Sequence, residues 1–220
     1  MSILNFIDIE TIPDQRAGAK ERAGDMVKHP ANMSKQETID KWEIEKKPAL
    51  IDEAWLKTSL NGAYGEIISA ALAVGDGEII SVSRDLGDSE GDMLQSLFNC
   101  IDITNKTPPF YIGHNVTFDL KFLWQRSVIL GIKPPFEINW QGRHGQHYFD
   151  NMQAWAGFRE YIKQDLLCEL LGIKSTLEFN MDGSQVWSEV EAGHISKVAE
   201  YNRDDVYKAR EIYKKLNYIK

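Results

Sequence analysis

Two carboxylates stand two residues apart near the end of an apolar segment, in the run Phe6-Ile-Asp8-Ile-Glu10. If this segment is a strand, side chains at i and i+2 point to the same face of the sheet. Two neighbouring carboxylates repel each other and lose hydration unless something binds them. A hard divalent cation such as Mg²⁺ or Mn²⁺, which prefers oxygen ligands, would remove the repulsion. The alternative is that both side chains face solvent at a strand end.

A second pair, Asn115 and Asp119, stands at i and i+4 near the start of an expected helix over Val116–Leu130. This spacing puts both side chains on one helix face. Asn115 follows a short strand, so it is also suited to cap the helix. Asp119 alone could simply be favoured by the helix dipole. His114 is expected to be a hydrogen-bonded structural residue rather than a metal ligand.

A third pair, Tyr201 and Asp205, has the same i, i+4 spacing in an expected helix over Ile195–Leu216. A tyrosine hydroxyl beside a metal-bound carboxylate can orient a water molecule. The alternative is a surface acidic pair, Asp204 and Asp205, with Tyr201 packed at the helix edge. Asp204 is expected to be solvated and to pair with Lys208 four residues later.

The three pairs, in this order along the chain, are a more specific indication of function than any one pair alone. The segments Asp8-Ile-Glu10-Thr11, His114-Asn-Val-Thr-Phe-Asp119 and Tyr201-Asn-Arg-Asp-Asp205 resemble the three motifs of the DEDD superfamily of 3′–5′ exonucleases, which have a ribonuclease-H-like fold. The tyrosine is typical of the DEDDy branch, because the sister branch has His where this chain has Glu200. The chain is similar above all to stand-alone relatives of the exonuclease domain of family B DNA polymerases.

The resemblance implies a two-metal-ion site. Two Mg²⁺ or Mn²⁺ ions would stabilise both the attacking and the leaving oxygen of a phosphodiester. The implied ligands are Asp8, which would bridge the ions, Glu10 and Asp205 on the nucleophile side, and Asp119 on the second ion. Tyr201 would orient the attacking water.

Substrate contacts are expected at four further positions. By resemblance, Thr11 and Ile12 would touch the terminal nucleotide. Asn115 and Arg143 are the other candidates, and Arg143 lies in a loop over residues 140–147 that combines an aromatic residue, a cation and two histidines. Such residues suit single-stranded nucleic acid, but a solvated surface loop would have the same composition.

The function implied is hydrolysis of phosphodiester bonds at the 3′ end of single-stranded DNA. A 3′–5′ exoribonuclease is the alternative, and contacts to the 2′-OH would distinguish the two. A third reading is a catalytically idle module that binds nucleic acid or a replication protein. The chain shows no polymerase domain, so proofreading would require a polymerase or another replication partner in trans.

These residues must be positioned by strands and helices. The order of the strands and helices expected from the sequence predicts an α/β domain with a mixed five-stranded sheet flanked by helices. The expected strands are Ile3–Ile9, Glu66–Val74, Glu78–Val82, Pro109–Gly113 and Tyr148-Phe149. Besides the two helices above, helices are expected over Gly91–Ile103, Asn151–Phe158 and Gln164–Leu171, with Asp150 as an N-cap. Residues 1–220 are expected to form a single exonuclease domain. A polar stretch over residues 14–63 should be a helical insertion with helices near Arg16–Val27 and Lys35–Ile44, broken at Pro30 and Pro48.

The composition and charge of the chain restrict the kinds of partner that are expected. The 220 residues carry a formal charge of −8, which argues against a passive nucleic-acid binder. An acidic enzyme can still act on nucleic acid if cations neutralise its site. Two cysteines are too few for a disulfide framework. The chain shows no apolar run long enough for a bilayer and no secretory signal, so no membrane partner is expected, and the expected location is the cytoplasm of a bacterium or of a phage-infected host.

Overall fold

The computed structural model describes residues 3–101 and 109–219. They form two compact units along the chain. The first unit comprises the segment that ends at Glu10 and the segment that begins at Ile67, and the second is Thr11–Glu66. None of the helices in the described ranges combines the length and apolarity that crossing a bilayer requires.

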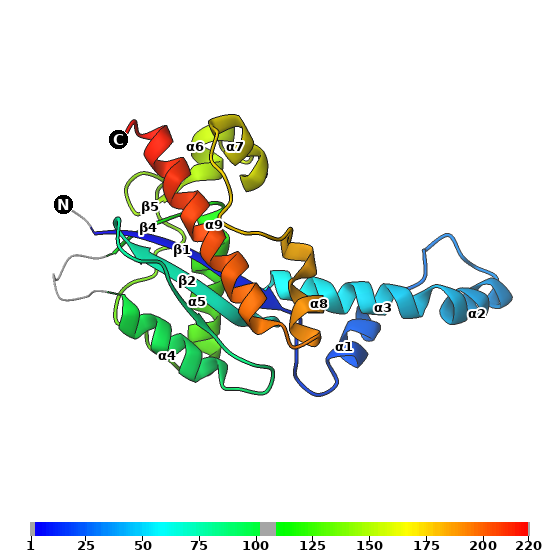
Figure 1. The fold of residues 1–220 in the computed structure, drawn as a ribbon. Coiled ribbons are helices and arrows are strands. Elements are labelled where there is room, and N and C mark those ends of the chain that lie inside the picture. Colours follow the sequence, from blue (N-terminus) through cyan, green and yellow to red (C-terminus); the bar gives the residue numbers. More distant parts are fainter. Residues whose placement is uncertain (1–2, 102–108, 220) are drawn as a thin grey trace. The chain divides into compact units, whose positions relative to one another are not determined.

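The first unit is built on a five-stranded sheet with the order β3-β2-β1-β4-β5. Its strands are β1 (Leu4–Ile12), β2 (Glu66–Val74), β3 (Ile80–Ser83), β4 (Phe110–Gly113) and β5 (Tyr148–Asp150). β1, β4 and β5 are parallel, whereas β2 and β3 are antiparallel to each other. The predicted α/β fold with a mixed five-stranded sheet is therefore confirmed (Figure 1).

Helices cover both faces of this sheet because β1 and β2 are apolar on both sides. On one face, Ile7 and Ile9 pack in a large core with α4 (Glu90–Cys100) and α5 (Val116–Leu130). On the other, Phe6 packs with Val206 and Tyr213 of α9 (Ile195–Leu216). In Figure 1, α9 lies across the sheet, and α4 and α5 lie on its other side.

The helices expected over Val116–Leu130, Gln164–Leu171 and Ile195–Leu216 have those bounds in the structure, as α5, α7 and α9. α4 ends at Cys100, before the expected Ile103, but residues 102 and 103 lie outside the described residues. α6 (Asn151–Ala156) is shorter than predicted because Gly157 ends it at φ 103°. α8 (Val186–Glu191) and the short 3₁₀ turn η2 (Gly183–Gln185) were not predicted.

The second unit is helical, as expected for residues 14–63. It contains α1 (Ala19–Met26), α2 (Gln36–Glu45), α3 (Lys47–Leu56) and the 3₁₀ turn η1 (Lys57–Leu60). α3 was not predicted, because Pro48 was taken only as a break. In the structure Pro48 lies in the first turn of α3, where the missing N–H costs no hydrogen bond. Within this unit Lys20 pairs with Asp52 at 2.7 Å and joins α1 to α3.

A buried ion pair joins α4, α5 and β2 in the first unit. The guanidinium of Arg126 on α5 contacts both carboxylate oxygens of Glu90 at the start of α4, at 2.9 and 2.5 Å. Glu90 Oε1 also accepts the backbone N–H of Ile67 at 2.8 Å. Both ionic side chains are less than a tenth exposed, so each depends on the other for its charge to be tolerated.

We expect Arg126→Met to lower the free energy of unfolding by about 3–5 kcal/mol, because it leaves the Glu90 carboxylate buried without its counter-charge. Urea denaturation followed by circular dichroism measures this. The double variant Glu90→Gln/Arg126→Met keeps an acceptor for Ile67 and removes the charge, so it should recover much of the loss. An Arg126→Met protein as stable as the wild type would contradict the inference that the buried charge of Glu90 depends on Arg126.

Candidate active site

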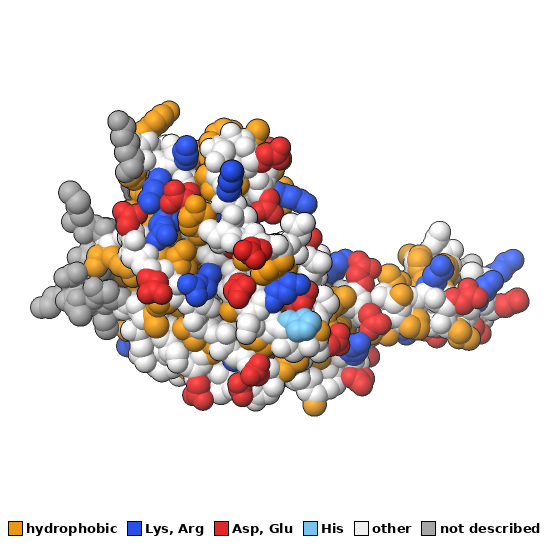
Figure 2. All heavy atoms as spheres, in the orientation of Figure 1, with side chains coloured by type: hydrophobic (Ala, Val, Ile, Leu, Met, Phe, Trp, Pro, Cys, Tyr) orange, Lys and Arg blue, Asp and Glu red, His pale blue; other side chains and the backbone are white. Residues whose placement is uncertain are grey.

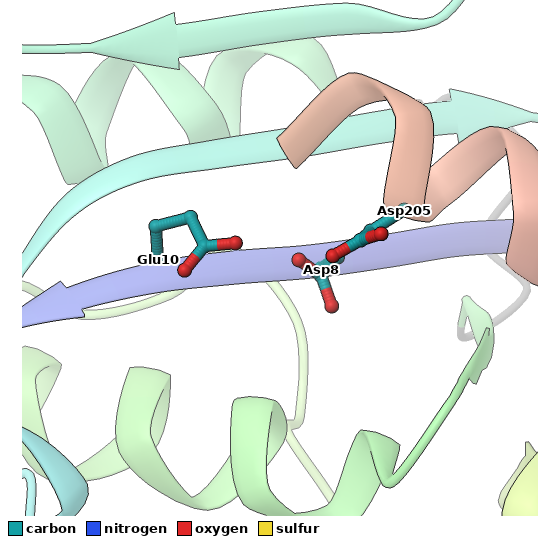
Figure 3. Close-up of side chains that lie close together, drawn as sticks. All are labelled: Asp8, Glu10 and Asp205. Carbon is teal, nitrogen blue, oxygen red and sulfur yellow. The ribbon is translucent and has the colours of Figure 1, made fainter. Parts of the chain in front are cut away.

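Asp8 and Glu10 project from β1 on the face that α9 covers. The strand alternation that buries Ile7 and Ile9 against α4 and α5 sends Phe6, Asp8 and Glu10 the other way. There they meet Asp205 of α9, and one carboxylate oxygen from each of the three residues lies within 4.8 Å of the other two. Figure 3 shows Asp8 and Asp205 side by side and Glu10 further along β1. The structure thus brings the first and third acidic motifs together.

Asp119 reaches the same strand from α5. Its Oδ1 accepts the backbone N–H of Ile9 at 3.1 Å. Just before β1, Ile3 O accepts the backbone N–H of Phe110 in β4, whereas Leu4 O accepts the backbone N–H of Gly75, directly after β2. Alternation therefore directs the Ile9 N–H toward β4. β4 ends at Gly113, so that N–H has no strand partner, and the Asp119 carboxylate takes its place.

Gly113 makes this close approach possible. A Cβ at this position would lie 2.8 Å from the backbone oxygen of Ile7 and 3.0 Å from the side chain of Val116. Any larger residue would push β4 away from β1 or displace the start of α5. The turn that carries Asp119 to the edge of β1 therefore needs glycine here.

Tyr201 and Asp205 lie one turn apart on α9, as their spacing predicts. Both are buried, each 8% exposed, and the Tyr201 hydroxyl is hydrogen-bonded to the Asp205 carboxylate. Burial and the nearby charges of Asp205, Glu10 and Asp8 raise the pKa of Tyr201 far above its usual range. Tyr201 consequently keeps its proton at neutral pH and acts as a hydrogen-bond donor.

The carboxylates themselves are destabilised as anions. Burial raises the pKa of Asp8 well above its usual range, and the charges of Asp119, Asp205 and Glu10 add to this. Burial and then neighbouring charges do the same to Glu10. Burial also raises the pKa of Asp205 to about 6, although Lys208 opposes the rise. The cluster therefore binds protons readily, and it would exchange them for a cation.

Lys208 is the cation beside this cluster. Its Nζ contacts Asp165 at 2.8 Å, Asp204 at 2.9 Å and Asp205 at 3.1 Å. The predicted pairing with Asp204 is present, but the prediction that Asp204 is solvated is wrong. Asp204 is 1% exposed, and it accepts hydrogen bonds from Ser175 Oγ and from the backbone and hydroxyl of Thr176. The carboxylate anchors the loop before α8 to α9, a long-range contact that helical spacing does not reveal.

Asn202 is a site residue that the sequence reasoning missed. It is fully buried, and its Nδ2 donates to Asp8 Oδ2 at 2.7 Å. Its Oδ1 accepts from Ser69 Oγ of β2 at 3.0 Å. Ser69 thereby fixes the orientation of the amide, and the amide fixes one oxygen of Asp8. The only sequence signal was the position of Asn202 directly after Tyr201.

The residues around the turn after β4 have other roles. Asp150 caps α6, as predicted, and accepts the backbone N–H groups of Met152 and Asn115 at 3.0 and 2.9 Å. Asn115 occupies the N-cap position of α5, but in a left-handed conformation (φ 62°) and without a side-chain capping bond, so the predicted cap interaction is wrong. His114 donates from Nε2 to Ile162 O at 2.8 Å, in agreement with its expected structural role.

The other expected substrate contacts are Arg143, Thr11 and Ile12. Arg143 is exposed beside the amino end of β5, the edge strand, where its backbone N–H donates to His147 Nδ1 at 2.8 Å. The structure does not bring Arg143 to the four carboxylates. Thr11 and Ile12 belong to the second unit, where Thr11 Oγ1 donates to Ser59 O at 2.7 Å. Their contact with a nucleotide stays a prediction.

The raised pKa values predict that the metal-free protein loses stability as pH rises. These groups bind protons more tightly in the folded than in the unfolded state, so their contribution to the free energy of unfolding falls as pH rises above about 4 and through the folded-state pKa values. Asp8→Asn removes one repelling charge. It should therefore raise the melting temperature in chelator at pH 8 by a few degrees, and this gain should shrink toward pH 5.

Thermal unfolding followed by circular dichroism checks this from pH 5 to 8. Glu200→Gln, the same kind of acid-to-amide change at an exposed position of α9, is the control and should leave the pH profile of the melting temperature unchanged. An Asp8→Asn protein that is less stable than the wild type at pH 8 would assign a structural role to Asp8.

Comparisons with known proteins agree with this geometry. The fold is similar to a solved structure described as that of the family B DNA polymerase from the hyperthermophilic archaeon Pyrobaculum calidifontis, with a TM-score of 0.61 and 14% identity. The likeness covers 99% of this chain and 25% of the polymerase chain, so this chain spans about a quarter of its length. Comparison with curated proteins gave no match.

A family model described as "Predicted 3′-5′ exonuclease related to the exonuclease domain of PolB" matches residues 59–220, which hold the second and third motifs. Because that match covers well over half of the chain, the chain belongs to this family of exonucleases related to the PolB exonuclease domain.

Proposed function

We propose that this protein is a metal-dependent 3′–5′ exonuclease that removes nucleotides from the 3′ end of single-stranded DNA. The observation that carries the proposal is the meeting of Asp8, Glu10 and Asp205, whose oxygens lie within 4.8 Å of one another. The Asp119 carboxylate is bonded to the same strand. Such a cluster is costly to an apoprotein and suits a site that binds cations.

The donor set fits hard divalent ions, because all four side chains offer carboxylate oxygens and the cluster found among the described residues contains no Cys or His. Asp8, Glu10, Asp119 and Asp205 would hold two Mg²⁺ or Mn²⁺ ions. When bound, the ions would supply positive charge to the phosphodiester and to the attacking and leaving oxygens.

The chain's own groups then have distinct tasks. Tyr201, which keeps its proton, donates to Asp205 and can orient a water molecule beside it. Asn202 holds one oxygen of Asp8 through an amide that Ser69 orients. Lys208 offsets part of the negative charge of Asp205 through a contact at 3.1 Å. Glu10, Asp8 and Asp205 are left to face the scissile phosphate.

The charge distribution is consistent with a site that depends on cations. On the face drawn in Figure 2, acidic and basic side chains are interspersed rather than segregated, and the whole sequence has a net charge of −8. Phosphate binding is therefore expected to depend on the metal ions more than on a basic surface. A cytoplasmic setting and a polymerase or other replication partner in trans are part of the proposal.

The first test uses DNA and RNA oligonucleotides labelled at either end, with Mn²⁺, with Mg²⁺ and with chelator. A ladder from 5′-labelled DNA and a labelled mononucleotide from 3′-labelled DNA, both lost in chelator, are expected. Cleavage that survives removal of metal would contradict the mechanism. A ladder from RNA alone would assign the activity to an exoribonuclease, and no cleavage by folded protein would favour the idle binding module.

Tyr201→Phe should lower kcat by about 10- to 100-fold, the cost of one hydrogen bond to a charged group. Asp205→Asn should reduce activity below detection, because it removes a proposed metal ligand. Tyr213→Phe, on the same helix and packed against Phe6 with ring centroids 5.6 Å apart, is the matched control and should have the wild-type rate. A Tyr201→Phe enzyme with an unchanged rate would remove the role assigned to this hydroxyl.

Asn202→Ala should weaken Mn²⁺ binding by about 10-fold or more, as loss of a group that orients a metal ligand commonly does. Isothermal titration calorimetry of the folded variant measures this without turnover. Ser69→Ala leaves the amide in place but removes the bond that orients it, so its effect should have the same direction and be smaller. Equal Mn²⁺ affinity in Asn202→Ala and wild type would refute the positioning of Asp8 by Asn202.

A further inference from the structure

The connection between α6 and α7, residues 157–163, presents aromatic rings to solvent. In this segment, called the aromatic loop below, Phe158 is 73% exposed and Tyr161 is 71% exposed. The guanidinium of Arg159 lies 5.1 Å from the centroid of the Phe158 ring. Exposed apolar side chains that lie close together often mark a binding surface.

The aromatic loop is attached to the carboxylate site at its carboxyl end. Ile162 O accepts the Nε2–H of His114, the residue directly after β4, at 2.8 Å. Just after the loop, Gln164 Nε2 donates to the backbone oxygen of Asp205 at 3.0 Å. The next residue, Asp165, shares Lys208 with Asp205. The loop therefore ends directly beside two of the three acidic motifs.

The backbone of the aromatic loop turns sharply at two positions. Gly157 ends α6 at φ 103°, and Arg159 has φ 65°, a left-handed conformation that is unfavourable for a residue with a side chain. Ile162, which is only half-buried, packs against Leu167 and Ile212 and anchors the loop from below. The backbone thus turns sharply and exposes Phe158, Arg159 and Tyr161 instead of folding them into the core.

Resting on the proposed exonuclease function, we propose that the aromatic loop binds the unpaired nucleotides next to the 3′ end. Bases stack on Phe158 and Tyr161, and Arg159 contacts a phosphate. Aromatic faces accept any base, and arginine pairs with the strand's phosphates. Tyr161 stands four residues before Asp165, so the Cα atoms of the two residues lie at most about 14 Å apart. This is within reach of the last few nucleotides of a strand whose end lies at the carboxylates.

Single-stranded nucleic acid fits this loop better than a protein partner does. Hydrogen bonds join the end of the loop to His114 and Asp205, in the motifs that would bind the phosphodiester. The guanidinium of Arg159 lies beside the Phe158 ring. Glu160 adds an opposing charge, so affinity should come from stacking more than from electrostatic attraction. The preferred substrate would then be a strand with at least a few unpaired 3′ nucleotides, and a fully paired end would be poor.

The test measures binding and turnover separately. Fluorescence anisotropy with 5′-labelled single strands, in an Asp205→Asn background that does not cleave, compares intact strands with strands that carry an abasic nucleotide at each of the last six positions. Phe158→Ala and Tyr161→Ala should each raise the Kd by about tenfold, the cost of one base–aromatic stack. An abasic nucleotide at the stacked position should raise the Kd of the parent protein equally, yet have little further effect in the matching variant.

Tyr218→Ala is the matched control. Tyr218 is 93% exposed and lies 13 residues beyond Asp205, past the end of α9, roughly 20 Å away along the helix direction. It should bind all strands as the parent does. Circular dichroism of each exposed-site variant should match the parent, because none of these rings is part of the core.

The outcomes separate the two proposals. If the wild-type protein cleaves but both loop variants bind every strand like the parent, the aromatic loop has no role in substrate binding and the inference is overturned while the activity stands. If the wild type does not cleave but abasic nucleotides and loop variants weaken binding non-additively, the loop inference stands and the proposed activity falls. If abasic nucleotides and loop substitutions weaken binding additively, stacking on these rings is refuted.

Discussion

The hydrogen bond from the backbone N–H of Ile9 to Asp119 joins the sheet to α5 at the point where β4 stops. Had β4 continued, its backbone would have paired with this N–H, and α5 could not have brought a carboxylate to β1. The early end of β4 depends on Gly113, whose missing side chain lets the strand pass close to Ile7, and on the turn through Asn115 into α5. One unpaired strand position is therefore what allows an acidic side chain from the opposite face of the sheet to reach the strand that carries Asp8 and Glu10.

The buried carboxylates of this site destabilise the folded protein when they are charged. The groups around them stabilise the charge of some carboxylates more than that of others. Asp204 and Asp205 are adjacent on α9, yet their environments push their pKa values apart. Burial would raise the pKa of Asp204, but hydrogen bonds from Lys208 and Thr176 outweigh it and lower the pKa. For Asp205, burial prevails over Lys208 and raises the pKa to about 6. The Asp204 carboxylate is stabilised by hydrogen bonds within the protein and has a structural role. The Asp205 carboxylate is destabilised as an anion, and this favours binding of a cation.

Much of this arrangement follows from local periodicity. The alternation of β1 puts Asp8 and Glu10 on one face, and the helical spacing of Tyr201 and Asp205 puts them on one face of α9. Helix bounds were predictable where apolar residues recur with helical spacing, as in α5 and α9. What could not be read from the sequence depends on contacts between distant residues. The bond between Asn202 and Asp8 spans 194 positions, and the burial of Asp204 depends on Ser175 and Thr176, which no short-range pattern connects to α9. Asn115 shows the reverse failure, since a good capping residue adopts a left-handed conformation instead, and its backbone N–H donates to Asp150 of β5.

Sequence similarity and structure identify different parts of the site. The family match begins at residue 59 and so includes Asp119, Tyr201 and Asp205 but neither Asp8 nor Glu10. The first motif lies in β1, separated from the matched region by most of the second unit, and a few residues in a buried strand leave little for sequence comparison to detect. Geometry connects them instead: β1 is the central strand, between β2 and β4, and both helices that carry the other motifs pack on its two faces. Because a central strand cannot shift its register without exposing Ile7 and Ile9, the same packing that builds the core also holds Asp8 and Glu10 opposite Asp205.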